Sequence, residues 1–267
     1  MRLKAIWIGV LGVALAASIT ACGGKKDDLD SEPAGGAAAT GGGPKVDAAT
    51  AGNIEGVVSF DGVAPKNEPI KMNADPVCVK ENPTPQTQET WEVADGKLAN
   101  VFVYIKDGLG NYSYDTPTEP MTMIDQKGCR YHPHVLAVRV GQPLEIINDD
   151  PTLHNIHALP KNNQEFNTGQ PIQGMKTTHV FNTKEIMVPF KCDVHGWMNA
   201  YLAVMDNPYY QVTGPDGKFS LKGVPPGKYT IEAWHEKGGS QTAMVEVTAK
   251  GTATANFTFK APATATN

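Results

Sequence analysis

Apolar and polar positions alternate along the chain from Asn53 onward. Apolar side chains recur at every second position or in short runs that end at turn dipeptides, and both patterns are typical of β-strands. The pattern predicts strands over residues 54–60, 99–105, 135–140, 144–147, 180–181, 186–190 and 200–205. No segment keeps a helical period of 3.6, so an all-β fold of the sandwich type is favoured.

A second series of strands begins near Pro208. These strands are predicted over residues 212–221, 224–234, 243–247 and 253–259. The first two segments each contain a turn through which the strand is entered, Pro-Asp-Gly in the first and Pro-Pro-Gly in the second. The letters DGxFxL followed by VPPGxYxIxAW resemble the carboxypeptidase regulatory-like domain, a small transthyretin-like β-sandwich, over roughly residues 208–260. Residues 56–60 also look like the opening strand of such a domain. The pattern leaves open whether this first strand joins the first body or the last sheet.

The amino terminus has the features of an export signal. Arg2 and Lys4 precede an apolar run over residues 5–17, which is too short for a comfortable membrane span. The following Ile-Thr-Ala-Cys resembles a bacterial lipobox, which implies that residues 1–21 are removed and Cys22 is lipidated. An ordinary cleavage that leaves a free thiol is the alternative. The resemblance predicts a lipid anchor on the periplasmic side of the bacterial cell envelope, and Gly23 favours the outer membrane.

Composition completes the expected domain organisation. Residues 22–52 are rich in Gly and Ala without one aromatic residue, so we expect a flexible tether there. We expect one folded domain over residues 53–207 and the regulatory-like sandwich over 208–267. The net charge is −5, which argues against nucleic acid as a partner.

The most informative motif lies in the segment Cys192-Asp193-Val194-His195-Gly196-Trp197-Met198. A thiolate, an imidazole and a thioether lie within seven residues between two predicted strands, and His154 supplies a second imidazole after another strand. Two histidines and one cysteine with a weak axial methionine describe a type 1 (blue) copper site with one ion. Such a site changes redox state with little rearrangement, as electron transfer requires.

The spacing of this motif resembles that of amicyanin, and the wider arrangement resembles the plastocyanin-like cupredoxins over roughly residues 98–206. This resemblance implies a Greek-key β-sandwich or barrel, and thus a cupredoxin-like copper domain with an N-terminal extension over residues 53–207. It also implies that Asn155, which follows His154, hydrogen-bonds across to the ligand loop. One departure is Gly196, where the amicyanin loop has a proline.

Each ligand has a competing interpretation. The alternative for Cys192 is a buried thiol in the apolar core. The alternative for Met198 is a side chain that packs in the core at the start of a strand. Zinc competes with copper because Cys and two His also form a zinc set. The methionine and the oxidising compartment favour copper.

Four other histidines are weaker candidates. His157 is predicted to lie near the site or on the surface. His132 and His134 form either a solvated turn or a pair at one ion. His235 is placed at the interface between the two domains.

Two further cysteines, Cys78 and Cys129, remain after Cys22 and Cys192 are assigned. Exported proteins most often pair such thiols, so we expect a disulfide. A second copper ion bound by these thiols is the alternative, but Cys78 lacks other ligand types close by in the sequence.

These features favour a membrane-tethered electron carrier that passes single electrons between redox partner proteins of the cell envelope. We recognise no convincing Ser-His-Asp, phosphate-loop or paired-carboxylate motif, so we expect no enzyme activity. A copper chaperone, storage or resistance protein with the same ligands is the main alternative. A copper enzyme with an open coordination position and a surface interaction module with a structural metal are further alternatives.

Overall fold

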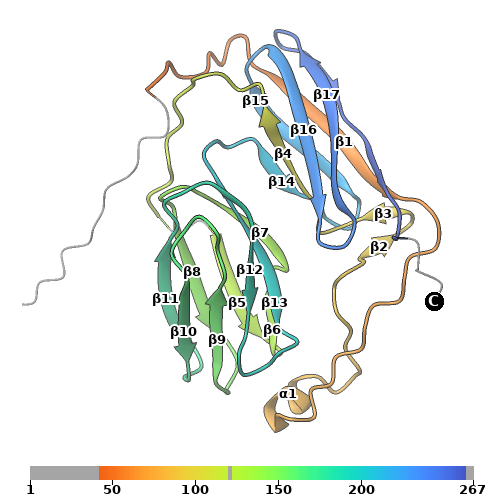
Figure 1. The fold of residues 1–267 in the computed structure, drawn as a ribbon, viewed down its shortest axis with the longest axis vertical. Coiled ribbons are helices and arrows are strands. Elements are labelled where there is room, and N and C mark those ends of the chain that lie inside the picture. The colour runs from red at the N-terminus through yellow and green to blue at the C-terminus, as the bar shows by residue number, and fades with distance from the viewer. Residues whose placement is uncertain (1–41, 120–121, 263–267) are drawn as a thin grey trace, which may run out of the picture. The chain divides into compact units, whose positions relative to one another are not determined.

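A computed structural model describes residues 42–119 and 122–262 (Figure 1). The predicted signal segment 1–21, the lipidation site Cys22 and tether residues 23–41 lie outside this part of the chain. Among the described residues, no helix is both long enough and apolar enough to cross a membrane.

The described chain is almost entirely β-structure, which confirms the predicted all-β class. Its strands are β1 (Gly52–Phe60), β2 (Val93–Ala94), β3 (Lys97–Leu98), β4 (Phe102–Asp107), β5 (Thr122–Lys127), β6 (Arg130–His132), β7 (Val135–Arg139), β8 (Pro143–Asn148), β9 (His154–Ala158) and β10 (Phe166–Gln170). They continue with β11 (Met175–Val180), β12 (Glu185–Lys191), β13 (Asn199–Met205), β14 (Tyr210–Val212), β15 (Lys218–Val224), β16 (Gly227–His235), β17 (Gly239–Val247), β18 (Thr252–Thr254) and β19 (Phe257–Phe259). One short helix, α1 (Pro76–Glu81), lies among the described residues.

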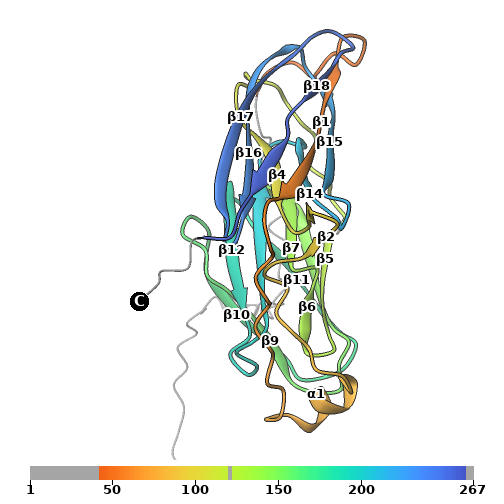
Figure 2. The same cartoon turned by 90° about the vertical axis from the view of Figure 1, so that its right-hand side faces the viewer.

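These strands form two sandwiches, and the chain enters one of them twice. The inserted sandwich, β5–β13, pairs the sheet β10-β9-β12-β13-β7 with the sheet β11-β8-β5-β6. The terminal sandwich is built from β1–β4 and β14–β19. Its sheets are β15-β1-β3-β2, with β18 and β19 also on β1, and β14-β4-β16-β17 (Figure 2). Each sandwich has its own apolar core.

This topology differs from the expected division between residues 207 and 208. Strand β1 is antiparallel to β15 and parallel to β18 and β19, so it belongs to the terminal sandwich. Strand β4 also lies in that sandwich, between β14 and β16. The reason is that alternation specifies a strand but not its partner, because its partner lies more than a hundred residues away in the sequence.

The uninterrupted apolar run of β4 has a packing explanation. Val103 and Ile105 face the core of the terminal sandwich. Phe102 and Tyr104 face the opposite way, into a third apolar cluster that includes Val135 of the inserted sandwich. Both faces of β4 are therefore covered, and a strand covered on both faces does not alternate with polar residues.

The predicted Pro-Asp-Gly turn is present before β15. The amide of Gly217 donates to the carbonyl of Gly214 at 2.9 Å, and Gly217 has a φ of +64°. A Cβ at this position would lie 2.3 Å from the carbonyl oxygen of Val58 in β1. Glycine is therefore required both by the left-handed backbone and by the close approach of β1.

The end of the predicted tether is bound to the folded body. The carbonyl of Pro44 accepts a hydrogen bond from the amide of Ser113 at 3.1 Å, and Lys45 forms an ion pair with Asp115. The carbonyl of Thr50 accepts from the amide of Lys250. The expected flexible segment thus does not extend through residues 44–50, because these partners lie far away in the sequence and were not visible from local composition.

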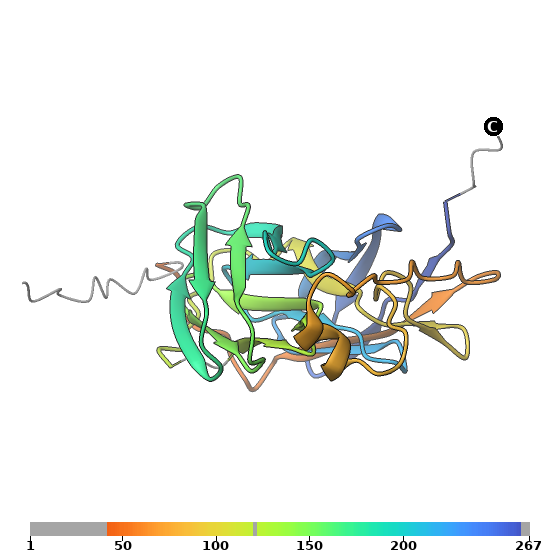
Figure 3. The same ribbon diagram turned by 90° about the horizontal axis from the view of Figure 1, so that it is seen from below.

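A long connection, the arm (residues 61–92), joins β1 to β2 and carries α1. It runs beside the inserted sandwich and brings α1 to the end of that sandwich at which β6 and β9 begin (Figures 1 and 3). The helix starts at Asp75, whose side chain accepts from the amide of Val77 at 2.7 Å, followed by Pro76 in the first turn. Its one buried residue is Cys78.

The expected disulfide joins Cys78 of the arm to Cys129 in the turn between β5 and β6. The two cysteines are 51 residues apart in sequence, and both are fully buried. The bridge therefore attaches the arm covalently to the inserted sandwich.

Removal of this bridge is expected to destabilise the protein. Because the bridge closes a loop of 51 residues, chain entropy predicts a loss of about 4 kcal/mol in the free energy of unfolding. Urea unfolding of the wild type and of a Cys78→Ala/Cys129→Ala variant, both without reductant, measures this loss. Equal unfolding free energies would contradict the expectation.

His235 is expected to make stability depend on pH. Its ring is 1% exposed and stacks on Trp91 at 4.3 Å, and burial lowers its pKa from 6.5 to about 4. Below about pH 6.5 the His235 ring binds a proton in the unfolded chain, whereas in the folded chain it stays neutral down to about pH 4. The contribution of His235 to the free energy of unfolding is therefore complete above pH 6.5 and is lost as the pH falls toward 4. Between about pH 7 and about pH 5 the loss is about 2 kcal/mol. Unfolding at both pH values should show a smaller loss for His235→Phe, and an unchanged loss would refute this.

Candidate metal centre

The ligand loop follows β12 and precedes β13. Cys192 comes directly after the last residue of β12, and its amide donates to the carbonyl of Met198 at 3.2 Å. The amide of Met198 donates to the carbonyl of His195 at 2.9 Å, and the amide of His195 lies 3.3 Å from the Cys192 sulfur. These bonds close the loop into a compact turn, so its side chains are held by two paired strands.

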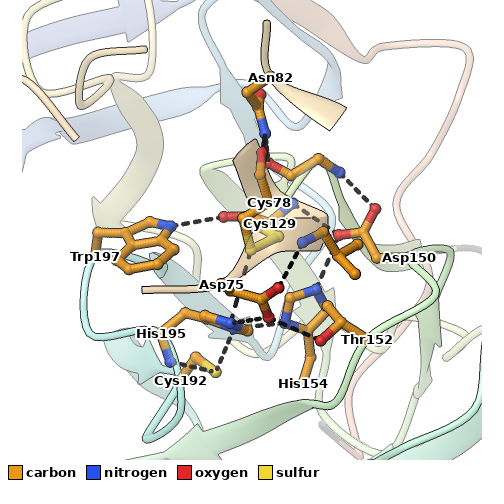
Figure 4. Close-up of a disulfide and its surroundings, with 12 residues drawn as sticks. Asp75, Cys78, Asn82, Cys129, Asp150, Thr152, His154, Cys192, His195 and Trp197 are labelled. Atoms are coloured by element: carbon orange, nitrogen blue, oxygen red, sulfur yellow. Dashed lines mark hydrogen bonds and ion pairs between the residues drawn. A yellow bond between two sulfur atoms is a disulfide. The ribbon is translucent and has the colours of Figure 1, made fainter. Parts of the chain in front are cut away.

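Three of the predicted ligands meet in one place. His154 lies at the start of β9, and its Nδ1 is 2.9 Å from Nδ1 of His195. The sulfur of Cys192 is 4.0 Å from the same nitrogen of His195, and the three donor atoms lie within 4.8 Å of one another. Relative exposure of the three residues is 0%, 2% and 2% for His154, Cys192 and His195. Figure 4 shows these side chains converging from β9 and from the ligand loop.

A carboxylate holds the far nitrogen of each imidazole. Nε2 of His154 is 2.8 Å from Asp150, and Nε2 of His195 is 3.0 Å from Asp75 on the arm. An ionised carboxylate only accepts, so each Nε2 carries the hydrogen and each Nδ1 is left with a lone pair. In the neutral rings these two lone pairs face each other at 2.9 Å, where either a shared proton or a metal ion would hold the two nitrogens together. The donor set therefore fits a metal ion, with the carboxylate–imidazole pairs acting as its outer support.

The electrostatics of the cluster favour a bound cation. Burial raises the pKa of Cys192, but hydrogen bonds from His154, His195 and two backbone amides outweigh burial and lower the pKa to about 6. Burial lowers the pKa of His154, but Asp150 and Cys192 outweigh it and raise the pKa. At neutral pH the Cys192 thiol therefore ionises readily, beside a His154 ring whose protonated form is favoured by its acidic neighbours.

Asn155 connects the start of β9 to the ligand loop. Its Oδ1 accepts from the amide of Asp193 at 2.8 Å and lies 3.2 Å from the sulfur of Cys192. Its Nδ2 donates to Asn167 at 2.7 Å. The side chain is thereby fixed at both ends and restrains the loop around the sulfur.

Met198 is 1% exposed and packs in the core cluster that also contains Cys192. Its backbone closes the ligand loop as described above. The role of its thioether as an axial ligand stays a prediction.

The sequence did not point to Asp75 or Asp150. Asp150 precedes His154 by four residues, but no motif in the sequence marks it as a partner of the imidazole. Asp75 lies 120 residues before His195, and its one sequence signal is its position before Pro76 and Cys78. The Cys78–Cys129 disulfide places the arm, and with it Asp75, beside the ligand loop.

The weaker histidine candidates lie outside the cluster. His157 binds Asp193 at 2.9 Å and Glu165 at 2.7 Å near the surface. His134 is buried, with Nε2 2.7 Å from Glu236, so the interpretation as a solvated turn is wrong for this residue. His132 is exposed. His235 packs in the core of the terminal sandwich.

One part of the chain is similar to a known family. Residues 199–260 match the model of the carboxypeptidase regulatory-like domain. The match begins in β13, which pairs with β12 and β7 of the inserted sandwich, and includes β14–β19 of the terminal sandwich. No curated protein matches the chain.

Similarity to solved structures is weak. A copper-containing nitrite reductase from Thermus scotoductus SA-01 has 18% identity over 37% of this chain, with a TM-score of 0.31. The match spans 24%, about a quarter, of the reductase chain. A purple cupredoxin from Nitrosopumilus maritimus has 24% identity over 32% of this chain and 99% of its own, with a TM-score of 0.28. A Cu(I) mutant of amicyanin has 18% identity over 34% and 97%, with a TM-score of 0.29.

Removal of the Asn155 side chain is expected to loosen the ligand loop. An Asn155→Ala variant should bind copper about 10- to 100-fold more weakly, as is typical when an outer support of a metal site is lost. Competition with a chelator measures the affinity. Asn162→Ala is the matched control because this asparagine is exposed and lies outside the cluster. Equal affinities of the two variants would contradict the role of Asn155.

Proposed function

We propose that this protein is a membrane-tethered blue copper protein that transfers single electrons between redox partners in the bacterial cell envelope. His154, Cys192 and His195 would hold one copper ion, with Met198 as the weak axial ligand. The observation that carries the proposal is the convergence of two lone-pair Nδ1 atoms and a readily ionised thiol within 4.8 Å. Bound copper would supply one-electron redox chemistry.

The surroundings of the cluster support electron transfer. The ligands lie at the ends of paired strands, in a loop closed by backbone hydrogen bonds, and two carboxylates fix the imidazoles. Fixed ligands favour rapid electron transfer because little rearrangement accompanies a change of charge. His154, Cys192 and His195 are each at least 98% buried, and this burial disfavours a substrate or solvent ligand on the metal. We therefore propose a carrier without enzyme activity.

The same burial disfavours the main alternative. A chaperone must hand over its metal, and here Asp75 and Trp197 cover His195, with the indole ring centre 5.0 Å from the imidazole. The expected behaviour is slow loss of copper to a chelator together with reversible voltammetry. Rapid copper exchange would favour the chaperone or storage function instead.

The envelope location rests on the amino-terminal sequence. A lipid at Cys22 would tether the folded body to a membrane, and the Cys78–Cys129 bridge fits an oxidising compartment. The partners would be redox proteins of the same compartment.

The copper site is tested by metal analysis with an optical spectrum. The oxidised protein should hold one copper ion and show an intense visible sulfur-to-copper charge-transfer band, because the Cys192 thiolate is bound directly. Cys192→Ser should abolish the band, whereas His132→Gln, a change at an exposed histidine, should preserve it. A colourless protein loaded with Cu(II), or binding of zinc alone, would overturn the proposal.

A further inference from the structure

The arm adds a charged group to the metal centre from a distant part of the chain. Asp75 Oδ2 lies 3.0 Å from Nε2 of His195 and accepts from the hydroxyl of Thr152 at 2.8 Å. Its Oδ1 accepts from the amide of Val77 at 2.7 Å. The carboxylate is therefore fixed by three partners and is not free to follow a rotating imidazole.

This contact determines where the metal-facing nitrogen of His195 lies. Nε2 and Nδ1 are on opposite sides of the ring, so a bond that holds Nε2 on Asp75 keeps Nδ1 directed at His154 and Cys192. His195 is on the ligand loop, and Asp75 is on the arm. The orientation of the His195 ring thus depends on the arm, which lies outside the inserted sandwich that carries all the predicted ligands.

The arm is fastened to the inserted sandwich at several points. Cys78 is bridged to Cys129, and Asn82 donates to the carbonyls of Cys78 and Gly128, each at 2.9 Å. Gln88 donates to the carbonyl of Trp197 in the ligand loop at 3.1 Å. These contacts hold α1 in place over His195 (Figure 4).

The same disulfide lies between the supports of both imidazoles. The amides of Gly128 and Cys129 donate to Asp150 at 2.8 and 2.7 Å, and Asp150 holds His154. Asp75 lies three residues before Cys78. One covalent bridge therefore connects the two carboxylates that orient the two histidines.

We propose that Asp75 is a positioning residue for the metal ligand His195, and that the disulfide-fastened arm uses it to retain the metal and lower its reduction potential. The proposal rests on the proposed copper site. A carboxylate that accepts the Nε2 hydrogen makes the imidazole a stronger donor. Its negative charge stabilises Cu(II) more than Cu(I), and the arm covers the edge through which His195 would swing away.

Three variants of the full chain test this proposal. Asp75→Ala removes both the charge and the hydrogen bond, so copper affinity should fall about 10- to 100-fold in chelator competition and the reduction potential should rise. Asp75→Asn keeps an oxygen that accepts from Nε2, so the potential should rise while most of the affinity is kept. Glu81→Gln is the matched control, because it removes the same charge from an exposed position on the same helix.

Two results would overturn the proposal. One is an Asp75→Ala protein with the same copper affinity and reduction potential as Glu81→Gln. The other is an Asp75→Asn protein whose potential stays at the wild-type value, which would show that the carboxylate charge has no influence on the metal.

A measurement on the metal-free protein separates this proposal from the proposed function. The Nε2–H of His195 should exchange slowly with solvent in imidazole NMR spectra of the wild type and Asp75→Asn, and rapidly in Asp75→Ala. Rapid exchange in the wild type would refute the positioning role. If the wild type takes up no copper but this pattern holds, the copper function fails while the role of Asp75 in orienting His195 stands.

Discussion

The candidate metal centre depends on the hydrogen bonds that hold the Nε2 atoms of two buried imidazoles. Asp150 and Asp75 each accept from one Nε2, which leaves both Nδ1 lone pairs facing each other beside the thiol of Cys192. Two facing lone pairs in a dry interior need a proton or a metal ion between them, and a metal ion bound there would satisfy both nitrogens.

The fold provides this arrangement through its topology. The inserted sandwich supplies His154 from the start of β9 and the ligand loop from the β12–β13 connection, which places these donors at one end of two adjacent strands. The arm that carries Asp75 belongs to the connection between two strands of the terminal sandwich. The centre is thus assembled by both parts of the chain, although its donors come from one sandwich.

The same arrangement limits the chemistry. His154, Cys192 and His195 are buried and fixed by hydrogen bonds, so their geometry would change little with the charge of an ion bound there. Asp150 and Asp75 place negative charge behind the two imidazoles. The terminal sandwich, whose sequence matches the regulatory-like domain in part, contributes apolar contacts to the inserted sandwich through β4.

Local patterns in the sequence determined many of the strands, the Pro-Asp-Gly turn, the ligand loop and the pairing of Cys78 with Cys129, because each is encoded within short segments or by residue type. They did not mark β5, β9 or β10 as strands. The tertiary structure alone decided that β1 and β4 join the terminal sandwich and that Asp75 reaches His195. These contacts join residues more than a hundred positions apart, and neither alternation nor motif spacing specifies a distant partner. The arm's polar, irregular sequence carried no signal of its place until the disulfide fixed it there.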